Sequence, residues 1–173
     1  IEDRKLWNIN VLCGSYLPEW RPGRDYRNTT SAKKDLGGGV LLDLSHEFDY
    51  VQWLAGRLNL KYAINEKVSN LEIESNDLLL FVGKTKMDAY VNITLNYFSR
   101  KPIREIILDG DGISFKADFI DNKLSVVLDH ETSDFSWPNM EKNDTYLAQH
   151  KSILRENSIK ACTFSEGLEL MYL

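Results

Sequence analysis

The chain has 173 residues, 43% of them hydrophobic and 27% charged, which is the length and composition of one globular domain. Acidic residues outnumber basic ones by 26 to 21 and no cluster of Lys and Arg stands out, so the sequence predicts neither a nucleic-acid nor a membrane-surface partner. The longest apolar runs are strand-sized and fall far short of the ~20 residues that a membrane helix needs.

The chain opens on a predicted strand and continues into a long loop. Apolar residues alternate with polar ones over Leu6–Gly14, the period of a strand with one buried face; they are Trp7, Ile9, Val11 and Cys13. Residues 15–35 carry two prolines, a glycine and many hydrogen-bonding side chains, which argues against a regular element. A structureless connection of this length favours a functional loop.

A glycine-rich turn followed by a helix is predicted over Leu36–Gly56, with Gly56 at the C-terminal stop. At about 100° per residue, the side chains of this helix divide into two faces. The apolar face consists of Leu44, Phe48, Val51 and Ala55. The polar face, which we expect to be wet, consists of Asp43, His46, Glu47 and Tyr50.

Strands dominate the rest of the chain, and the turn signals between them predict antiparallel pairing through short hairpins. The expected strands are Leu60–Val68, Asp77–Lys84, Asp88–Phe98, Ile103–Asp109, Ile113–Asp118 and Lys123–Leu128. Helical spacing returns over Glu141–Asn157, and Thr163 with Glu166 three residues later is typical of a capping box before a last helix.

These elements predict an α+β fold, with a predominantly antiparallel open sheet and helices packed on one of its faces. Such a sheet leaves its other face uncovered, and apolar residues there need a partner. The run Leu78–Val82 carries apolar residues on both alternating sets, which fits burial on two sides. We therefore expect a homodimer or tetramer formed through the second sheet face.

Cysteine and histidine usage indicates neither disulfides nor a metal site. Cys13 and Cys162 do not make a disulfide framework, and the first residues have no signal-peptide pattern, so we expect reduced thiols in a cytoplasmic protein. The three histidines, His46, His130 and His150, are scattered along the chain, so no metal is predicted.

The densest chemical pattern is the stretch GGGVLLDLSHEFDYVQWLAG at residues 37–56. Asp43, His46 and Asp49 are spaced three apart at the start of a helix, so the first two can point into one cleft. A carboxylate stabilises a protonated imidazole, which makes His46 a candidate general base. The same pattern also suits a half-buried surface histidine whose acidic neighbours cap the helix, since structural ion pairs outnumber catalytic ones.

The long loop holds Trp20, Arg21, Arg24, Asp25, Tyr26 and Arg27. Arginines can grip a carboxylate or phosphate in a bidentate manner and aromatic rings can stack on sugar faces, so this loop is a candidate specificity element. Alternatively, these residues only anchor a long loop through ordinary ion pairs.

The stretch at residues 37–56 resembles the signature of the C-terminal domain of the glucose-fructose oxidoreductase, inositol dehydrogenase and rhizopine catabolism (Gfo/Idh/MocA) family. That signature is usually a glycine cluster, an Asp, a His and a second acid before a Trp-Leu-x-Gly helix end. The order of elements also resembles this domain, down to a terminal helix that starts T-x-x-E-G-L. The resemblance covers nearly the whole chain.

The resemblance implies that residues 1–173 are one substrate-binding and dimerising domain of an NAD(P)-dependent oxidoreductase acting on a sugar, cyclitol or nucleotide sugar. It implies that His46 is the acid/base for the substrate hydroxyl, with Asp43 as its partner. The expected substrate contacts are Asp49 and the loop residues Trp20, Arg21, Arg24 and Tyr26. Here His46 follows Asp43 by three positions, whereas many members have four.

The family's cofactor-binding motifs do not occur in this sequence. The Gly-x-Gly-x-x-Gly phosphate turn and the Glu-Lys-Pro motif are missing, and the cluster Gly37–Gly39 lacks the dinucleotide-binding spacing. We expect the Rossmann domain that would hold NAD or NADP to lie outside this chain, and this chain alone to bind no cofactor and to be inactive. Both ends look cut, since an apolar strand begins near residue 1 and an apolar helix reaches Leu173.

Two other functions fit the same residues. The chain could be a non-catalytic module that holds a ligand with its arginine and aromatic loop. It could also be a purely structural dimerisation domain, which predicts that the face of Asp43 and His46 is packed shut.

Overall fold

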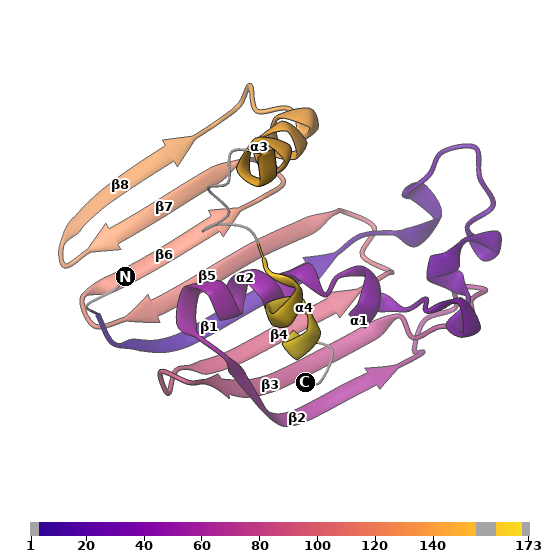
Figure 1. The fold of residues 1–173 in the computed structure, drawn as a ribbon, viewed down its shortest axis with the longest axis horizontal. Helices are drawn as coiled ribbons and strands as arrows, with labels where there is room; N and C mark the ends of the chain where they lie inside the picture. The colour runs from indigo at the N-terminus through magenta and orange to yellow at the C-terminus, as the bar shows by residue number, and fades with distance from the viewer. Residues whose placement is uncertain (1–3, 155–161, 171–173) are drawn as a thin grey trace.

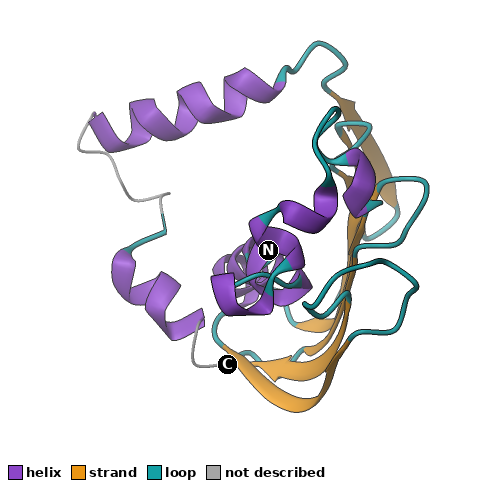
Figure 2. Cartoon of the chain, turned by 90° about the vertical axis from the view of Figure 1, so that its right-hand side faces the viewer, coloured by secondary structure: helices purple, strands orange, loops and turns teal. Residues whose placement is uncertain are grey.

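One eight-stranded sheet organises the chain, and the α-helices lie on one of its faces (Figures 1 and 2). The computed structural model describes residues 4–154 and 162–170. The strand order is β2-β3-β4-β1-β5-β6-β7-β8, and every pair is antiparallel except β1 with β4. The predicted α+β fold is confirmed. The strands are β1 Leu6–Gly14, β2 Leu58–Glu66, β3 Leu78–Thr85, β4 Tyr90–Asn96, β5 Ile103–Gly110, β6 Ile113–Asp118, β7 Lys123–Leu128 and β8 Glu131–Ser136.

The first strand of the chain occupies the centre of the sheet, between β4 and β5. Ile9 and Val11 are buried as the alternation predicts, and Val11 lies between Ile93 of β4 and Ile106 of β5. The prediction was wrong for Trp7, which is 53% exposed. The register shifts between Leu6 and Asn8, and such a bulge changes the side to which a strand residue points.

The single helix predicted to follow the glycine-rich turn within residues 36–56 is two helices, α1 Val40–Asp43 and α2 His46–Ala55. The chain leaves helical geometry at Leu44, and the Ser45 hydroxyl donates to the Leu42 carbonyl at 3.0 Å, which competes with a continuous helix. The predicted apolar face is confirmed, because Leu44, Phe48, Val51 and Ala55 are all buried. Phe48 meets Phe81 of β3 edge-on, with ring centroids 5.1 Å apart.

The long loop contains four short 3-10 turns, η1 Leu17–Glu19, η2 Tyr26–Asn28, η3 Thr30–Ala32 and η4 Lys34–Leu36, where the sequence predicted no regular element. Each is a single turn stabilised by local bonds, so no long periodic pattern announces it. The loop is tied to the sheet, since the Leu17 amide donates to the carbonyl of Tyr97 at 2.9 Å. The loop therefore has a fixed position beside the ends of β1 and β4.

The C-terminal part differs from the prediction in two ways. Strand β8 was not predicted, because its sequence ETSDFS is mostly polar and all six residues are exposed. Helix α3 spans Lys142–Leu154 inside the predicted Glu141–Asn157, whose last residues lie outside the described ones. Its apolar side chains stay exposed, and Figure 2 shows the helix standing away from the sheet.

The last helix, α4, spans Phe164–Leu170 and begins with the predicted capping box. The Thr163 amide donates to Glu166 at 2.7 Å, and the Glu166 amide donates to the Thr163 hydroxyl at 3.3 Å. Among residues 4–154 and 162–170, no helix has the length and apolar character to cross a membrane.

The sheet face away from the helices is mixed in character. In β3, Phe81 faces the helices and is buried, whereas Val82 on the other face is 41% exposed. Tyr62 of β2 lies opposite Val82 and is 61% exposed. Asn10 and Asn92 pair across β1 and β4 on the same face. The uncovered face therefore has an apolar side, over β2 and β3, and a polar centre.

Candidate functional site

The candidate residues collect at one end of the sheet. The parallel strands β1 and β4 finish there, and the antiparallel β5 begins there (Figure 1). The long loop after β1, helix α1 and the N-terminus of α2 lie at the same end. Parallel neighbours with a loop and a helix N-terminus at their carboxyl ends form a recurrent place for binding sites.

Asp43, the last residue of α1, accepts a hydrogen bond from a buried tyrosine. The Tyr97 hydroxyl donates to Asp43 Oδ2 at 2.7 Å, and Tyr97 itself is fully buried directly after β4. Burial and the Asp43 carboxylate raise the pKa of Tyr97, so its hydroxyl stays a donor. Trp20 packs edge-on against the Tyr97 ring at 5.2 Å and donates from Nε1 to the Ser15 hydroxyl at 2.7 Å.

His46, the first residue of α2, contacts a buried carboxylate. Its Nε2 lies 3.0 Å from Glu47 Oε1, and its side chain is 51% exposed while that of Glu47 is 0% exposed. Glu47 Oε1 also accepts from Arg104 Nε at 2.7 Å, and Glu47 Oε2 accepts from the Tyr50 hydroxyl at 2.8 Å. The half-exposed imidazole of His46 thus contacts the ion pair between Glu47 and Arg104, in which the Glu47 carboxylate is inaccessible to water.

Glu47 remains ionised despite its burial. Burial acts against the charge, but the hydrogen bond from His46, the charge of Arg104 and the hydrogen bond from Tyr50 outweigh it and hold the pKa of the Glu47 carboxyl below its ordinary value. The Cys13 thiol lies close by on β1, and burial, followed by the Glu47 charge, raises the pKa of this thiol to about 12. Cys13 is therefore neutral and leaves one negative charge in the cluster.

The structure gives Asp43 and His46 different partners. The sequence placed them together on one helix, but the break between α1 and α2 separates them, and no hydrogen bond or ion pair joins them in the described part of the chain. The expectation that Glu47 lies on the wet face was wrong. Glu47 is three residues after Leu44 and four before Val51, so the helical period puts it at the edge of the apolar face.

Arg104 is the partner that the sequence analysis missed. In β5, Ile106 and Leu108 point toward the helices and are buried. Arg104 lies two residues before Ile106, so its side chain points to the same face of the sheet. A guanidinium aimed at a core needs a buried counter-ion. The pair could have been identified from the sequence by two signals together. One is an arginine among the strand residues that face the core, and the other is an acid at the edge of the apolar face of a helix.

The predicted loop residues share one narrow crevice, which Trp20, Arg21, Arg24 and Tyr26 line together. Tyr26 is anchored, since its hydroxyl accepts from the Glu72 amide at 3.2 Å. The side chains of Arg21 and Arg24 are exposed and make no hydrogen bond or ion pair within residues 4–154 and 162–170. The alternative for this loop, anchoring through ion pairs, applies to Arg27, which pairs with Asp25 and Glu72.

In the described part of the chain, no hydrogen bond or ion pair joins Asp49 to Asp43 or His46. Asp49 lies one turn further along α2, where α4 packs, against the Cys162 thiol just before α4. Burial, followed by the Asp49 carboxylate, raises the pKa of Cys162 to about 11. The contact of Asp49 is thus with Cys162, which precedes the C-terminal helix.

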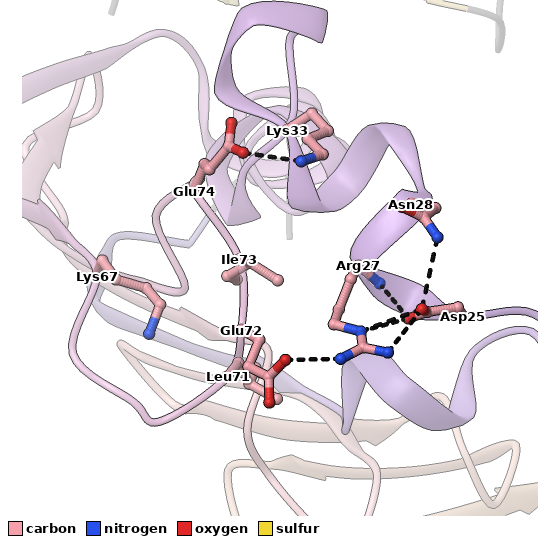
Figure 3. A pocket seen from close by; sticks show the side chains of 9 residues that line it. All are labelled: Asp25, Arg27, Asn28, Lys33, Lys67, Leu71, Glu72, Ile73 and Glu74. Carbon is pink, nitrogen blue, oxygen red and sulfur yellow. Dashed lines mark hydrogen bonds and ion pairs between the residues drawn. The ribbon is translucent and has the colours of Figure 1, made fainter.

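A hollow of about 600 Å³ lies beside the loop but contains none of the candidate residues (Figure 3). Figure 3 shows Arg27 bridging Asp25 and Glu72, and Lys33 reaching Glu74. The remaining cation, Lys67, lies 3.4 Å from the buried Asp77. Each cation of the wall is neutralised by a carboxylate, so the hollow has no charge left for a ligand.

The glycine cluster serves close packing. A Cβ on Gly38 would lie 2.1 Å from the carbonyl oxygen of Thr30, and Gly39 has φ +131° before α1. Backbone carbonyl oxygens of Thr30, Ser31 and Lys33 fill the space beside Gly38, so a larger residue does not fit there. Within the described ranges, no group of three or more His, Cys, Asp or Glu side chains is placed to hold a metal.

Solved structures resemble this fold at low sequence identity. The aldose-aldose oxidoreductase from Caulobacter crescentus, solved with glycerol, matches 97% of this chain and 51% of its own with a TM-score of 0.74 and 14% identity. The WlbA dehydrogenase from Bordetella pertussis, solved with NADH and UDP-GlcNAcA, matches 98% of this chain and 50% of its own with a TM-score of 0.67 and 17% identity. A super-repressor mutant of Gal80p from Saccharomyces cerevisiae matches 90% and 46% with a TM-score of 0.68 and 14% identity.

These likenesses establish the fold alone, and the chain spans only about half the length of these solved relatives. A comparison with curated protein sequences finds no match. The model of the oxidoreductase family, C-terminal alpha/beta domain, matches residues 1–171. Because this match covers nearly the whole chain, the chain belongs to the Gfo/Idh/MocA oxidoreductase family, as its C-terminal alpha/beta domain.

Proposed function

We propose that this chain is the substrate-binding half of an NAD(P)-dependent dehydrogenase that oxidises a hydroxyl of a sugar, cyclitol or nucleotide sugar, with His46 as acid/base. The observation that carries the proposal is the half-exposed imidazole of His46 held on the buried, ionised Glu47. Family membership and the position of the site at the ends of β1 and β4 support it.

The chemistry divides between this chain and the rest of the protein. Oxidation of a carbinol needs a base for the hydroxyl proton, and His46 can accept it because its imidazole is half-exposed at the site and lies against Glu47, which holds it in place. Asp43 uses Oδ2 to accept from Tyr97, which leaves Oδ1 to accept from the substrate. The unpaired Arg21 and Arg24 would contact an anionic group of the substrate. NAD(P), which would accept the hydride, is proposed to bind outside this chain.

A non-catalytic binding module is the second candidate. The likeness to Gal80p, a protein named as a repressor, favours it, since the same fold occurs there. In that case the loop with Trp20 and Arg21 would hold a ligand and His46 would be structural. A closed dimerisation domain is less well supported, because the His46 side chain is 51% exposed.

Turnover by the full-length protein tests the first candidate. We expect it to reduce NAD⁺ or NADP⁺ with at least one member of a panel of sugars, cyclitols and nucleotide sugars, followed by nicotinamide absorbance. The 173-residue chain alone should give no saturable change in nicotinamide fluorescence, since its sequence lacks the Gly-x-Gly-x-x-Gly phosphate turn. Ligand binding by the full-length protein without any turnover across the panel would favour the binding module. Micromolar NADH affinity of the isolated chain would place the cofactor site within it.

We further propose that the chain dimerises through the apolar side of the uncovered sheet face, where Tyr62 and Val82 are exposed. Sedimentation velocity at micromolar concentration should give a dimer, and Val82→Arg should shift it toward monomer because a charge is buried there without a partner. Leu36→Arg, at an exposed loop position away from the sheet, is the matched control and should remain dimeric. A wild-type chain that stays monomeric at tens of micromolar contradicts the proposal.

A further inference from the structure

We propose that Glu47 is a positioning residue that fixes the tautomer and orientation of His46, so that Nε2–H donates to Glu47 and Nδ1 is the nitrogen that exchanges a proton with the substrate. This inference rests on the proposed role of His46 as the base. It adds which atom of the imidazole reacts and which buried group selects that atom.

The tautomer follows from what each atom can donate. An ionised carboxylate only accepts hydrogen bonds, and a neutral imidazole carries one N–H. Because His46 Nε2 lies 3.0 Å from Glu47 Oε1, where two lone pairs would repel each other, we infer that this nitrogen carries the hydrogen. Nδ1 is then left with its lone pair, and no group among residues 4–154 and 162–170 is bonded to it.

The carboxylate is itself fixed in place. Two hydrogen bonds reach its two oxygens, from Arg104 to Oε1 and from Tyr50 to Oε2, and His46 Nε2 also lies 3.0 Å from Oε1. Arg104 is held in turn, since its guanidinium lies 5.1 Å from the Phe119 ring, on which Tyr50 also packs at 5.6 Å. Since Glu47 is 0% exposed, water cannot replace any of these donors.

The charges around Glu47 argue for orientation as its main role. Facing it are His46 and Tyr50 from α2, Cys13 from β1 and Arg104 from β5. Burial and the Glu47 charge raise the pKa values of both Tyr50 and Cys13, so these two groups stay neutral. Arg104 cancels much of the Glu47 charge, because both bonds end on the same oxygen. The hydrogen bond is left to hold the imidazole in one arrangement.

The proton transfer is then balanced at named atoms. As the substrate O–H bond breaks, its proton moves to His46 Nδ1, and the carbinol hydrogen leaves with its electron pair to the oxidised nicotinamide. The imidazolium that forms keeps its Nε2–H on Glu47, so no rotation of the ring is needed in either direction.

Nitrogen NMR of the imidazoles tests the inference directly. The chain has only three histidines, so ¹⁵N-histidine labelling with a His46→Gln reference assigns the His46 signals. With the ring in its neutral form, the wild-type chain should show one tautomer, with a protonated-type shift at Nε2, an unprotonated-type shift at Nδ1 and an Nε2 proton protected from exchange. Glu47→Met removes the acceptor, so the two nitrogen shifts should approach each other and the proton should exchange with water.

Two further variants separate positioning from charge and from folding. Glu47→Gln should retain the wild-type signals, because Arg104 can only donate and so turns the amide oxygen toward itself and His46. Tyr50→Phe is the matched control, since it removes only the bond to Oε2 and should also leave the His46 signals unchanged. The inference is overturned if wild-type His46 carries its hydrogen on Nδ1, or if Glu47→Met keeps the wild-type shifts and the protected proton.

Turnover of the full-length enzyme distinguishes this inference from the proposed function. Glu47→Met should lower kcat about tenfold to a hundredfold with a smaller change in KM, and Glu47→Gln should recover most of it. If the NMR results hold but His46→Ala leaves turnover intact, the proposed function fails while the coupling of His46 to Glu47 stands. If His46→Ala abolishes turnover and Glu47→Met leaves both tautomer and turnover unchanged, only the positioning role fails.

Discussion

Replacing His46 by alanine in the full-length enzyme should lower kcat by about 10²–10⁴-fold, the usual loss when a general base is removed. The fold should tolerate the change, because the His46 side chain is 51% exposed and Glu47 keeps its bonds from Arg104 and Tyr50. His130→Ala, an exposed position in the turn before β8, is the matched control and should leave kcat unchanged.

The pH profile sharpens this test. Loss of the base should abolish the limb of kcat/KM that reports its ionisation. Asp43→Asn should also slow turnover, because it keeps the shape and the bond from Tyr97 while removing the charge that faces the substrate. Near-normal turnover with an unchanged pH profile in His46→Ala would make His46 a structural residue and require a different base.

Replacing Arg104 by methionine should cost about 2 kcal/mol of unfolding free energy, because it leaves Glu47 as a buried charge without its cation. Removing one partner of a fully buried pair costs ~3–5 kcal/mol, and the figure is lower here because the Arg104 side chain is 36% exposed. Methionine retains much of the apolar stem, so the loss reports the charge. Urea unfolding followed by circular dichroism measures it.

Arg27→Met is the matched control, because Arg27 pairs with Asp25 and Glu72 at the surface and its loss should leave the unfolding midpoint nearly unchanged. The pH dependence gives a second check. The folded-state pKa of Glu47 is lowered, so its stabilising contribution is present above the unfolded carboxyl pKa of ~4.3 and is lost as pH falls through the folded value. The difference between wild type and Arg104→Met should therefore shrink in acid, and equal losses at neutral and acid pH would contradict the ion-pair explanation.

Local periodicity predicted most elements of the fold but not their arrangement. Alternation identified β1, and the 3.6-residue period identified the buried face of α2, because one side of each element meets the core. The insertion of β1 between β4 and β5 depends on contacts between residues far apart in the chain, which no local pattern contains. β8 was missed because an exposed edge strand needs no apolar alternation.

The candidate site was predicted in its residues and less well in its contacts. The motif drew attention to Asp43 and His46, and the structure places both at the ends of β1 and β4. Their partners, Tyr97 and Glu47, were missed because polar side chains were assumed to face water. Each is buried because a second polar group, Asp43 or Arg104, satisfies it in the interior, and that compensation is visible only in three dimensions.

The central position of β1 has a consequence for how the chain folds during synthesis. Strands β2–β4 form one meander and β5–β8 another, and these two halves contact each other mainly through β1. Leu6 pairs with Gly110 and Asn8 pairs with Tyr90. The eight-stranded sheet therefore cannot be completed until these distant residues have left the ribosome. Pairing between residues so far apart in the chain slows folding. Until β1 pairs with them, β4 and β5 are exposed edge strands of their meanders. Insertion of the nine-residue strand β1 covers both of these edges at once.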